Sequence, residues 1–542
     1  MDDLLIRGGD LIDGTGAPAR PADVAVRGDR IVAIEPGYAG AARVVIEAQG
    51  HVVAPGFIDV KTHSDFTLPL YPRAESRVHQ GITTELVGSC GFTAAPIPRG
   101  RLPAVADYLA AMAPALTLHE TSFASYVESF PATSVNVAMQ VGHNTVRVAV
   151  MGLDNRTPTA REQSTMERLV EEALDAGAVA LSSGPFTAPG AFAGPQELEA
   201  LARLAARHGV GYTTHIRDEA STAFDAVREA IALAESTGVR TRIVHIKVSG
   251  IENWGGAPRL LALLAVARER GVPIDCDQYP YTTALNPLRN LLPAWVQEGG
   301  PAHMLRRLAD AKARDDIRTE IAARGLNAFG RIPSWDAVRV TTSLAEPDEV
   351  GRSIVDIATR RGCDAVDALC DILLADRGAT RGLVTAMHED DVRAFVACPW
   401  VLVGSDGRAT GPGGPLAREL PHPRFYGTFA RILGHYARDL GLLTLPQAVH
   451  KMTGGPARAL GLADRGVLRT GAAADITVFD PASIADRATF DEPRRYPTGI
   501  AHVIVNGVAV IHGGAHTGAL PGRVLRRTAV SVRRGAQDKR AR

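Results

Sequence analysis

Six side chains able to bind a metal ion or transfer a proton each follow a short apolar run of the kind that forms a buried strand. They are His63, Cys90, His143, His215, His245 and Asp406. One such histidine alone would most simply be a structural residue. Six at the same end of successive strands are hard to explain by packing, because the carboxyl ends of the strands in a parallel barrel meet at one catalytic face. The pattern predicts one shared chemical site.

The types of these residues favour zinc. A thiolate with imidazoles is a borderline-soft ligand set that zinc accepts in tetrahedral geometry. Cys90, His215 and His245 would supply three ligands and leave the fourth position for water, as in catalytic zinc sites. Cys90 could instead be a small buried hydrophobic residue. However, glycines at 88 and 91 allow close approach of the backbone and an exposed sulfur, so we expect a ligand.

The elements that must position these residues are strands that alternate with helices. Helical stretches such as 161–177 and 194–209 separate most of the apolar runs, which predicts a (β/α)8 barrel. The stretch between the seventh and eighth runs is far longer than a crossover requires, so we expect a small insert at 287–345. The eight predicted strands lie within residues 56–63, 83–90, 134–143, 178–183, 210–215, 242–247, 272–279 and 400–406.

Both ends of the chain have a different pattern. Residues 1–53 and 463–528 contain short β-branched runs divided by Gly-Asp and Asn-Gly turns. We expect one β-sandwich assembled from both ends, the alternative being two unrelated β caps. The barrel would then comprise 54–286 and 346–462. Residues 529–542 are basic, and we interpret them as a solvated tail rather than a binding element.

Composition excludes several classes of partner. Lys and Arg number 59, as do Asp and Glu, so no net charge favours nucleic acid or an anionic membrane. No apolar run is long enough for a transmembrane helix, and the acidic start MDDLLIRGGD does not resemble a signal peptide. The five cysteines include no CxxC pair, which suits a reducing compartment. We expect a cytoplasmic protein whose oligomeric state the sequence leaves open.

The chain contains the motifs APGFIDVKTHSDF, QGITTELVGSCGF, VGHNTVR, YTTHIRDE, DQYPY, GSDG, HPRFYGTF and MTGGPARALGLADRGVLRTGAAADITVFDP. With these motifs it resembles the N-acyl-D-amino-acid deacylases, or D-aminoacylases, of the amidohydrolase superfamily. The resemblance extends from about residue 3 to 528. It implies a barrel with a β-sandwich, zinc, and hydrolysis of an N-acyl-D-amino acid or a related short peptide to a D-amino acid and a carboxylate.

The resemblance also implies roles for individual residues. Cys90, His215 and His245 correspond to the tight zinc ligands, and Asp406 to the catalytic aspartate. Arg424 would receive the substrate carboxylate, and His143 would support the site from behind. Further substrate contacts would come from Lys247, Tyr279, Tyr281, Ser183 and Thr187. Relatives that accept apolar D-residues often carry a tyrosine at the position of Thr187, so the substrate preference is not transferable.

Lys61 departs from the family pattern. Members of the family have His-x-His at the end of the first strand, where these histidines serve a second, weaker metal position. Here the motif is Lys61-x-His63, and a protonated lysine repels a cation. His63 remains a candidate ligand, but we expect the second position to be weak or absent. We interpret Lys61 as a cationic substitute for that metal, facing Cys90 and Asp406.

An alternative orientation for Lys61 is an ion pair with Asp59 or Asp65 at the rim of the site. For the reaction itself, Asp406 is expected to accept a proton from water and deliver it to the leaving nitrogen. Arg424 would grip the substrate carboxylate as a bidentate fork, unless it forms only a surface ion pair.

Three other functions remain open. A cyclic-amide hydrolase of the dihydropyrimidinase kind would need a carboxylated lysine after strand four, but 180–184 reads ALSSG. In the second alternative, Lys61 would serve as a Schiff-base or acid–base lysine in lyase or cyclase chemistry, on a scaffold that no longer hydrolyses. A metal-free binding protein is the third alternative, which the intact set of metal ligands disfavours.

Overall fold

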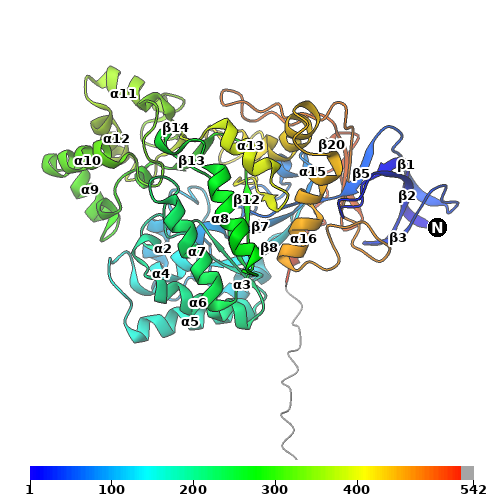
Figure 1. Cartoon of the computed structure of the whole chain (residues 1–542), viewed down its shortest axis with the longest axis horizontal. Helices are drawn as coiled ribbons and strands as arrows, with labels where there is room; N and C mark the ends of the chain where they lie inside the picture. The colour runs from blue at the N-terminus through cyan, green and yellow to red at the C-terminus, as the bar shows by residue number, and fades with distance from the viewer. Residues whose placement is uncertain (527–542) are drawn as a thin grey trace, which may run out of the picture.

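Three structural units follow one another along the long axis of the molecule (Figure 1). The computed structural model describes residues 1–526 of the chain, so the basic tail expected at 529–542 lies outside the described residues. A barrel occupies the middle. A helical unit lies at one end and a β-sheet, which contains the N-terminus, at the other.

Eight parallel strands form the barrel and confirm the predicted fold. They pair in chain order, with the eighth strand beside the seventh. Helices α5 (Ala160–Asp175) and α6 (Pro195–Arg207) connect neighbouring strands at the positions expected from sequence. The strands are β6 (Phe57–Asp59), β7 (Ile82–Val87), β8 (Asn136–Gly142), β9 (Ala180–Ser183), β10 (Gly211–Thr214), β11 (Thr241–Ile243), β12 (Ile274–Gln278) and β16 (Val401–Val403).

Helix α5 begins at a capping signal that the sequence supplies. Before α5, the Thr159 hydroxyl accepts a hydrogen bond from the amide of Glu162, whose carboxylate accepts one from the amide of Thr159. This reciprocal cap satisfies two amides that the first turn leaves free. The remaining helices are α1 (Glu75–Val78), α2 (Leu102–Leu109), α3 (Phe123–Ser129), α4 (His143–Met151), α7 (Ala223–Thr237), α8 (Ala257–Glu269), α13 (Glu389–Ala397), α14 (Arg424–Arg431), α15 (Leu445–Met452) and α16 (Gly454–Leu460).

The barrel closes through a short seam just beyond β6 and β16. Thr62 and Gly407 form a parallel bridge. The amide of His63 donates to the carbonyl of Gly407 at 2.8 Å, and the amide of Asp406 donates to the carbonyl of Lys61 at 2.9 Å. Closure of the barrel therefore sets Lys61 beside Asp406, although 345 positions separate them in the chain.

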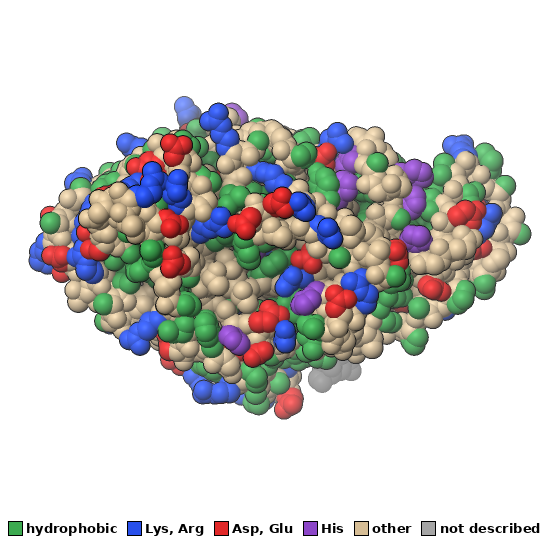
Figure 2. Space-filling model, turned by 90° about the horizontal axis from the view of Figure 1, so that it is seen from above, with side chains coloured by type: hydrophobic (Ala, Val, Ile, Leu, Met, Phe, Trp, Pro, Cys, Tyr) green, Lys and Arg blue, Asp and Glu red, His purple; other side chains and the backbone are tan. Residues whose placement is uncertain are grey.

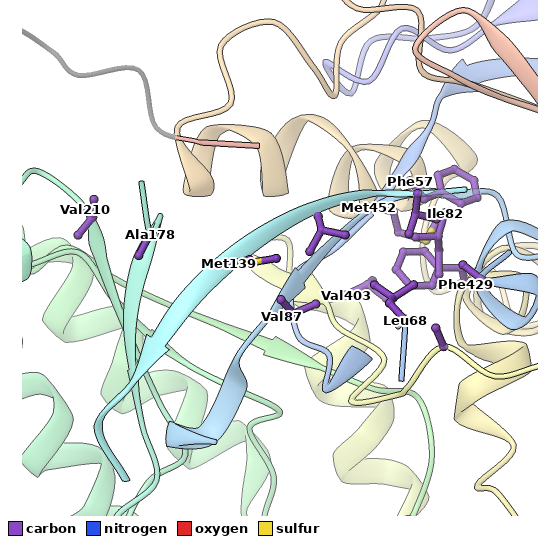
Figure 3. Packing of buried hydrophobic residues seen from close by; sticks show 14 of the residues in the cluster. Phe57, Leu68, Ile82, Val87, Met139, Ala178, Val210, Val403, Phe429 and Met452 are labelled. Atoms are coloured by element: carbon purple, nitrogen blue, oxygen red, sulfur yellow. The ribbon is translucent and has the colours of Figure 1, made fainter. Parts of the chain in front are cut away.

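Aromatic and branched side chains fill the space between the barrel and its outer helices (Figure 3). Phe57 stacks on Phe429 of α14 with ring centroids 5.8 Å apart. Ile82 and Met452 are also fully buried in this cluster. Burial of each such side chain contributes about 1.5–3 kcal/mol relative to exposure. The packing fixes β6 and β7, which lead directly into the site.

The unit between β12 and β16 has its own sheet and core. Its strands β13 (Thr283–Pro287), β15 (Arg381–Thr385) and β14 (Val338–Thr342) pair antiparallel in the order β13-β15-β14. Helices α9 (Pro301–Ala309), α10 (Ala311–Arg324), α11 (Ile354–Arg361) and α12 (Ala365–Ala375) cover it. The predicted insert at 287–345 was therefore too short. The chain returns through β15 to complete the sheet, so the unit extends to Thr385.

Both chain ends build one nine-stranded sheet, which confirms the expected joint β domain. Strand β5 pairs with β17, and this pairing joins the N-terminal strands to the C-terminal ones. The order is β20-β19-β18-β17-β5-β1-β2-β3, with β4 beside β1. The strands are β1 (Asp2–Leu11), β2 (Arg20–Arg27), β3 (Arg30–Glu35), β4 (Ala42–Glu47), β5 (Val52–Pro55), β17 (Ile476–Phe479), β18 (Ile500–Val505), β19 (Val508–His512) and β20 (Ala515–His516).

Buried polar contacts join this sheet to the barrel. The Asn506 side chain donates to Asn136 at 2.7 Å and to the carbonyl of Pro521 at 2.8 Å. It accepts from Arg465 at 3.0 Å, and its amide donates to Asp475 at 2.7 Å. A last short strand, β21 (Val524–Leu525), pairs with β8. The two units are therefore tied together through side chains as well as through apolar packing.

On the face of the molecule shown in Figure 2, Lys and Arg side chains are interspersed with Asp and Glu, so neither sign of charge dominates that face. Within residues 1–526, none of the helices combines the length and apolar character needed to cross a membrane.

Candidate metal and catalytic site

Cys90, His215 and His245 converge at the carboxyl ends of the barrel strands. One possible ligand atom from each lies within 4.8 Å of the other two, and all three residues are buried. The sulfur of Cys90 is 3.3 Å from Nε2 of His245. Phe186 stacks on the His215 ring, with centroids 3.6 Å apart and planes 9° from parallel. Backbone and packing thus hold the donors together.

Three site residues adopt left-handed backbone conformations. Cys90 has φ of 56°, His245 of 38° and Asp406 of 51°. Such conformations cost a non-glycine residue about 1–3 kcal/mol, and they persist only where the surroundings fix them. Each of the three follows the end of its strand, so the turn aims the side chain across the barrel mouth. Gly91 must remain small, because a Cβ there would collide with the side chain of Asn144.

The donor chemistry fits zinc. Burial raises the pKa of the Cys90 thiol to about 12, although the charge of Lys61 opposes the shift. A thiol in this setting becomes a stable thiolate only beside a further cation. Burial likewise lowers the pKa of His215 and His245, which favours the neutral imidazoles that ligate metals. A sulfur and two neutral imidazoles form a set that zinc accepts.

Glu219 is a site residue that the sequence reasoning missed. Its Oε1 lies 3.3 Å from Nε2 of His215, 3.2 Å from Nδ1 of His245 and 2.5 Å from Nζ of Lys247. The side chain of Lys247 also lies 2.7 Å from Nδ1 of His245. One buried carboxylate therefore contacts both candidate histidine ligands. The signal in the sequence was the motif YTTHIRDE, which places an acid four residues after His215.

Lys61 and Asp406 form a buried ion pair across the barrel seam. Nζ of Lys61 contacts Oδ1 of Asp406 and lies 2.9 Å from Nε2 of His63. Burial alone would raise the pKa of Asp406, but the charges of Arg424 and Lys61 outweigh burial and hold it well below the usual value. Only the backbone amide of Lys61 contacts Asp59. The alternative in which its side chain turns to the rim is therefore wrong.

His63 does not join the metal group. The sequence analysis counted it as a candidate ligand, but the converging set in the described chain comprises only Cys90, His215 and His245. The imidazole of His63 lies beside the Lys61 ammonium and 3.4 Å from Asp406. The Lys61 ammonium thus contacts both His63 and Asp406, the two residues that the sequence analysis assigned to a second metal position.

Arg424 lies inside the site. It is 2% exposed, so the alternative of a surface ion pair is wrong. Its Nη2 is 2.8 Å from Oδ2 of Asp406, and its Nε donates to the Asp406 carbonyl at 2.9 Å. The remaining Nη1 has no hydrogen-bond partner among residues 1–526. The guanidinium lies over the ring of Tyr279, 4.6 Å from its centroid, and the Tyr279 hydroxyl likewise has no partner there.

A cavity connects these groups and receives walls from two units. The barrel supplies Lys61, His63, Cys90, His215, His245, Lys247 and Asp406. The three-stranded unit supplies Ala284, Leu285, Asn286, Pro287, Asn290 and Arg381. Arg381 and Arg408, which the sequence analysis did not single out, both line the cavity. The reacting groups thus come from the barrel, and the opposite wall from the other unit.

Four expected site residues lie away from the cavity wall. The Ser183 hydroxyl contacts those of Tyr212 at 2.5 Å and Thr214 at 3.0 Å, on the face of β10 that packs against helices α6 and α7. Thr187 donates to Asn290 at 2.9 Å, so it supports the wall rather than forming it. The rest of the set is Tyr281, whose ring packs against His422 and Arg431, and His143, which lies 2.7 Å from Glu197. Direct substrate contacts by Ser183, Thr187 and Tyr281 are not supported by this arrangement.

Comparisons with known proteins agree with this geometry. A profile described as "Amidohydrolase family" matches residues 44–328 and 351–511. An N-acyl-D-glutamate deacylase of Alcaligenes xylosoxydans xylosoxydans is 39% identical over 529 residues, 97% of each chain. A D-aminoacylase of the same organism is 37% identical and covers 97% of this chain and 98% of its own.

A solved structure is similarly close. The N-acyl-D-glutamate deacylase from Bordetella bronchiseptica, complexed with zinc and a phosphonate inhibitor that mimics the tetrahedral intermediate, superposes with a TM-score of 0.81. It is 38% identical, and the match covers 97% of this chain and all of that one.

Proposed function

The chain belongs to the amidohydrolase family, and from this membership we propose that it hydrolyses the amide bond of N-acyl-D-amino acids with one zinc ion. The observation that carries the proposal is a single cavity that contains the Cys90, His215 and His245 donors, Asp406 and Arg424. Relatives named for this reaction, one of them solved with zinc, support it.

Each group has a defined part in the reaction. When bound, zinc would acidify a water molecule and polarise the amide carbonyl. Asp406 accepts a proton from the attacking water and delivers it to the leaving nitrogen, which must be protonated to depart. Lys61 contacts Oδ1 of Asp406 and Arg424 contacts Oδ2, so both oxygens of the proton-exchanging carboxylate are fixed in orientation.

Arg424 receives the α-carboxylate of the substrate. Its Nη1 has no partner in the described chain, and its planar fork matches a carboxylate. The Tyr279 hydroxyl, also unpaired there, is placed to add a hydrogen bond. The carboxylate at Arg424, the scissile carbonyl beside the zinc ligands and the side chain in the remaining cavity define three points. Three fixed points are enough to select one enantiomer.

Two alternatives lose support from the geometry. Strand β9 ends in Ser182 and Ser183, so no lysine is available to bridge two metals as in the dihydropyrimidinase kind. Lys61 is also unsuited to attack a carbonyl, because a nucleophilic lysine must be neutral. Burial tends to lower its pKa, but the Asp406 carboxylate outweighs burial and raises the pKa above the usual value.

The test combines metal analysis with a substrate panel. The purified chain is expected to contain close to one zinc and to hydrolyse N-acetyl-D-amino acids in preference to their L-enantiomers. Cys90→Ala should lose zinc. Asp406→Asn should retain zinc but lose about 10²–10⁴-fold in kcat. Hydrolysis of a hydantoin or dihydropyrimidine instead, or full activity of either variant, would contradict the proposal.

A further inference from the structure

Arg381 is a buried cation that forms no ion pair with the acidic side chains of residues 1–526. It is 4% exposed and lines the cavity from the start of β15. Its Nη1 donates to the carbonyl of Ala111 at 2.9 Å and approaches the sulfur of Met112. Its Nε has no hydrogen-bond partner, and no carboxylate within residues 1–526 forms an ion pair with it. Burying an uncompensated charge is costly, so this arrangement needs a reason.

The other two arginines of the cavity differ in this respect. Arg408 pairs with Glu419 at 2.8 Å, and Arg424 pairs with Asp406 at 2.8 Å. Burial and the neighbouring charge of Arg408 lower the pKa of Arg381 to about 9, which is low for a guanidinium. Of the three, only Arg381 faces the cavity with its charge unmatched.

A count of the charges around the cavity also shows more positive than negative charge. Lys247 is neutralised by Glu219, and Arg408 by Glu419. Lys61, Arg424 and Arg381 then face the single carboxylate of Asp406, which leaves two positive charges outside the zinc ligands. One carboxylate on the substrate would neutralise only one of them. A substrate with two carboxylates would balance the cavity.

We propose that Arg381 binds a second carboxylate of the substrate, so that the enzyme prefers dianionic N-acyl-D-amino acids. This inference rests on the proposed deacylation. Arg424 holds the α-carboxylate in that reaction, and Arg381 stands on the three-stranded unit, apart from the zinc ligands. The second carboxylate belongs either to an acidic side chain, as in D-glutamate or D-aspartate, or to a dicarboxylic acyl group such as succinyl.

The experiment uses two matched substrate pairs with the zinc-loaded enzyme. N-acetyl-D-glutamate and N-acetyl-D-glutamine differ only in the charge of the side chain. N-succinyl-D-methionine and N-succinamoyl-D-methionine place the same difference, a carboxylate against an amide, in the acyl group. We expect wild-type kcat/KM to favour the charged member of one pair by about 10- to 100-fold, and that pair identifies the source of the carboxylate.

Arg381→Met should abolish the preference by lowering kcat/KM for the charged member far more than for the neutral one. Arg381→Lys should retain part of the preference, because the charge remains while the fork is lost. The thermal midpoint of Arg381→Met should equal or exceed that of the wild type, since an unpaired buried charge is removed. A structural role predicts the reverse, with a lower midpoint and equal losses on all four substrates.

The outcomes separate this inference from the proposed function. If wild-type kcat/KM is equal for the neutral and the charged member of each pair, Arg381 does not select a second carboxylate, and the deacylase proposal stands. If no N-acyl-D-amino acid of the panel is hydrolysed, the proposed function falls and the inference falls with it.

Discussion

Glu219 is the residue on which the two histidine ligands depend. Its Oε1 contacts one ring nitrogen of His215 and one of His245, while the Lys247 ammonium contacts the same oxygen. A carboxylate that accepts from a ligating imidazole fixes the tautomer and the orientation of the ring. Here one carboxylate oxygen lies within 3.3 Å of a nitrogen of each ring, so one substitution should disturb both ligands together.

Glu219→Gln is therefore expected to weaken zinc binding by about 10–100-fold, the usual effect of removing such a partner. Competition with a chromogenic chelator measures this change without reference to activity. Glu197→Gln is the matched control, because Glu197 is an equally buried carboxylate that contacts His143 outside the cavity. The control should keep its zinc. If Glu219→Gln binds zinc as tightly as Glu197→Gln does, Glu219 does not support the histidine ligands.

Lys61 substitutions test whether its ammonium replaces a second metal. Lys61→Met should keep one zinc and lose turnover, because Asp406 loses the contact that orients it. Lys61→His should bind a second zinc under excess metal, since it restores His-x-His beside Asp406. Metal content per chain after dialysis measures both. If Lys61→His still holds one zinc and Lys61→Met turns over normally, the lysine is a bystander.

The sequence identified the three side chains that converge in the structure but missed the groups that contact them. Cys90, His215 and His245 follow apolar runs, and barrel geometry alone brings strand ends together. Glu219 follows its strand by several residues, and Arg381 starts a strand in another unit. Their positions depend on loop conformation and on non-local pairing, which residue types do not reveal.

At the scale of elements, the loop after β16 is held by a buried arginine. Arg77 of α1 donates to Glu85 on β7 at 3.0 Å, to the Ser405 hydroxyl at 2.8 Å and to the carbonyl of Phe425 at 3.1 Å. It thereby connects a helix, a strand and the turn that presents Asp406. Glu85 is eight positions from Arg77 in the chain, whereas Ser405 and Phe425 are 328 and 348 positions away.

Arg77→Met should lower the free energy of unfolding by about 3–5 kcal/mol, because Glu85 would be left as an uncompensated buried charge. Urea denaturation followed by circular dichroism measures the loss. The double variant Arg77→Met with Glu85→Gln should recover part of it, since the orphaned charge is then removed. No recovery in the double variant would show that the hydrogen bonds to Ser405 and Phe425 matter more than the charge.

The eight barrel strands could be predicted because each is a local apolar run. The predicted insert, 287–345, was too short because it left out β15. Its third strand, β15, pairs with β13 so that Pro287 lies opposite Arg381, which comes 94 positions later in the chain. Local patterns identify a strand but do not identify its distant partner. The boundary therefore had to come from the structure.

At the scale of the whole molecule, Asn506 joins the β domain to the barrel. Asn506→Ala would leave Asn136 and Arg465 without this hydrogen-bond partner. It would also put alanine in a left-handed conformation, with φ of 49°, which alanine adopts less readily than asparagine. We expect a loss of about 1–3 kcal/mol for the unsatisfied groups, and about 1–2 kcal/mol more for the backbone.

Asn506→Gly separates the two effects, because glycine accepts the left-handed conformation. It should be less destabilised than the alanine variant but still below the wild type. Thermal unfolding measures both, and a single transition is expected because the two units share buried contacts. Equal stability of the alanine and glycine variants would show that the backbone conformation contributes little.

The two connections of the three-stranded unit lie side by side. Thr283 pairs with Thr385, and their hydroxyls are 2.8 Å apart, so the chain leaves the barrel and rejoins it at neighbouring points. Everything between them can be exchanged as a cassette without rerouting the barrel. Arg381 belongs to this cassette, whereas Cys90 and Asp406 belong to the barrel. Substrate selectivity and catalysis therefore depend on separate segments of the chain. Recombination among relatives could then change what is cleaved without rebuilding the machinery that cleaves it.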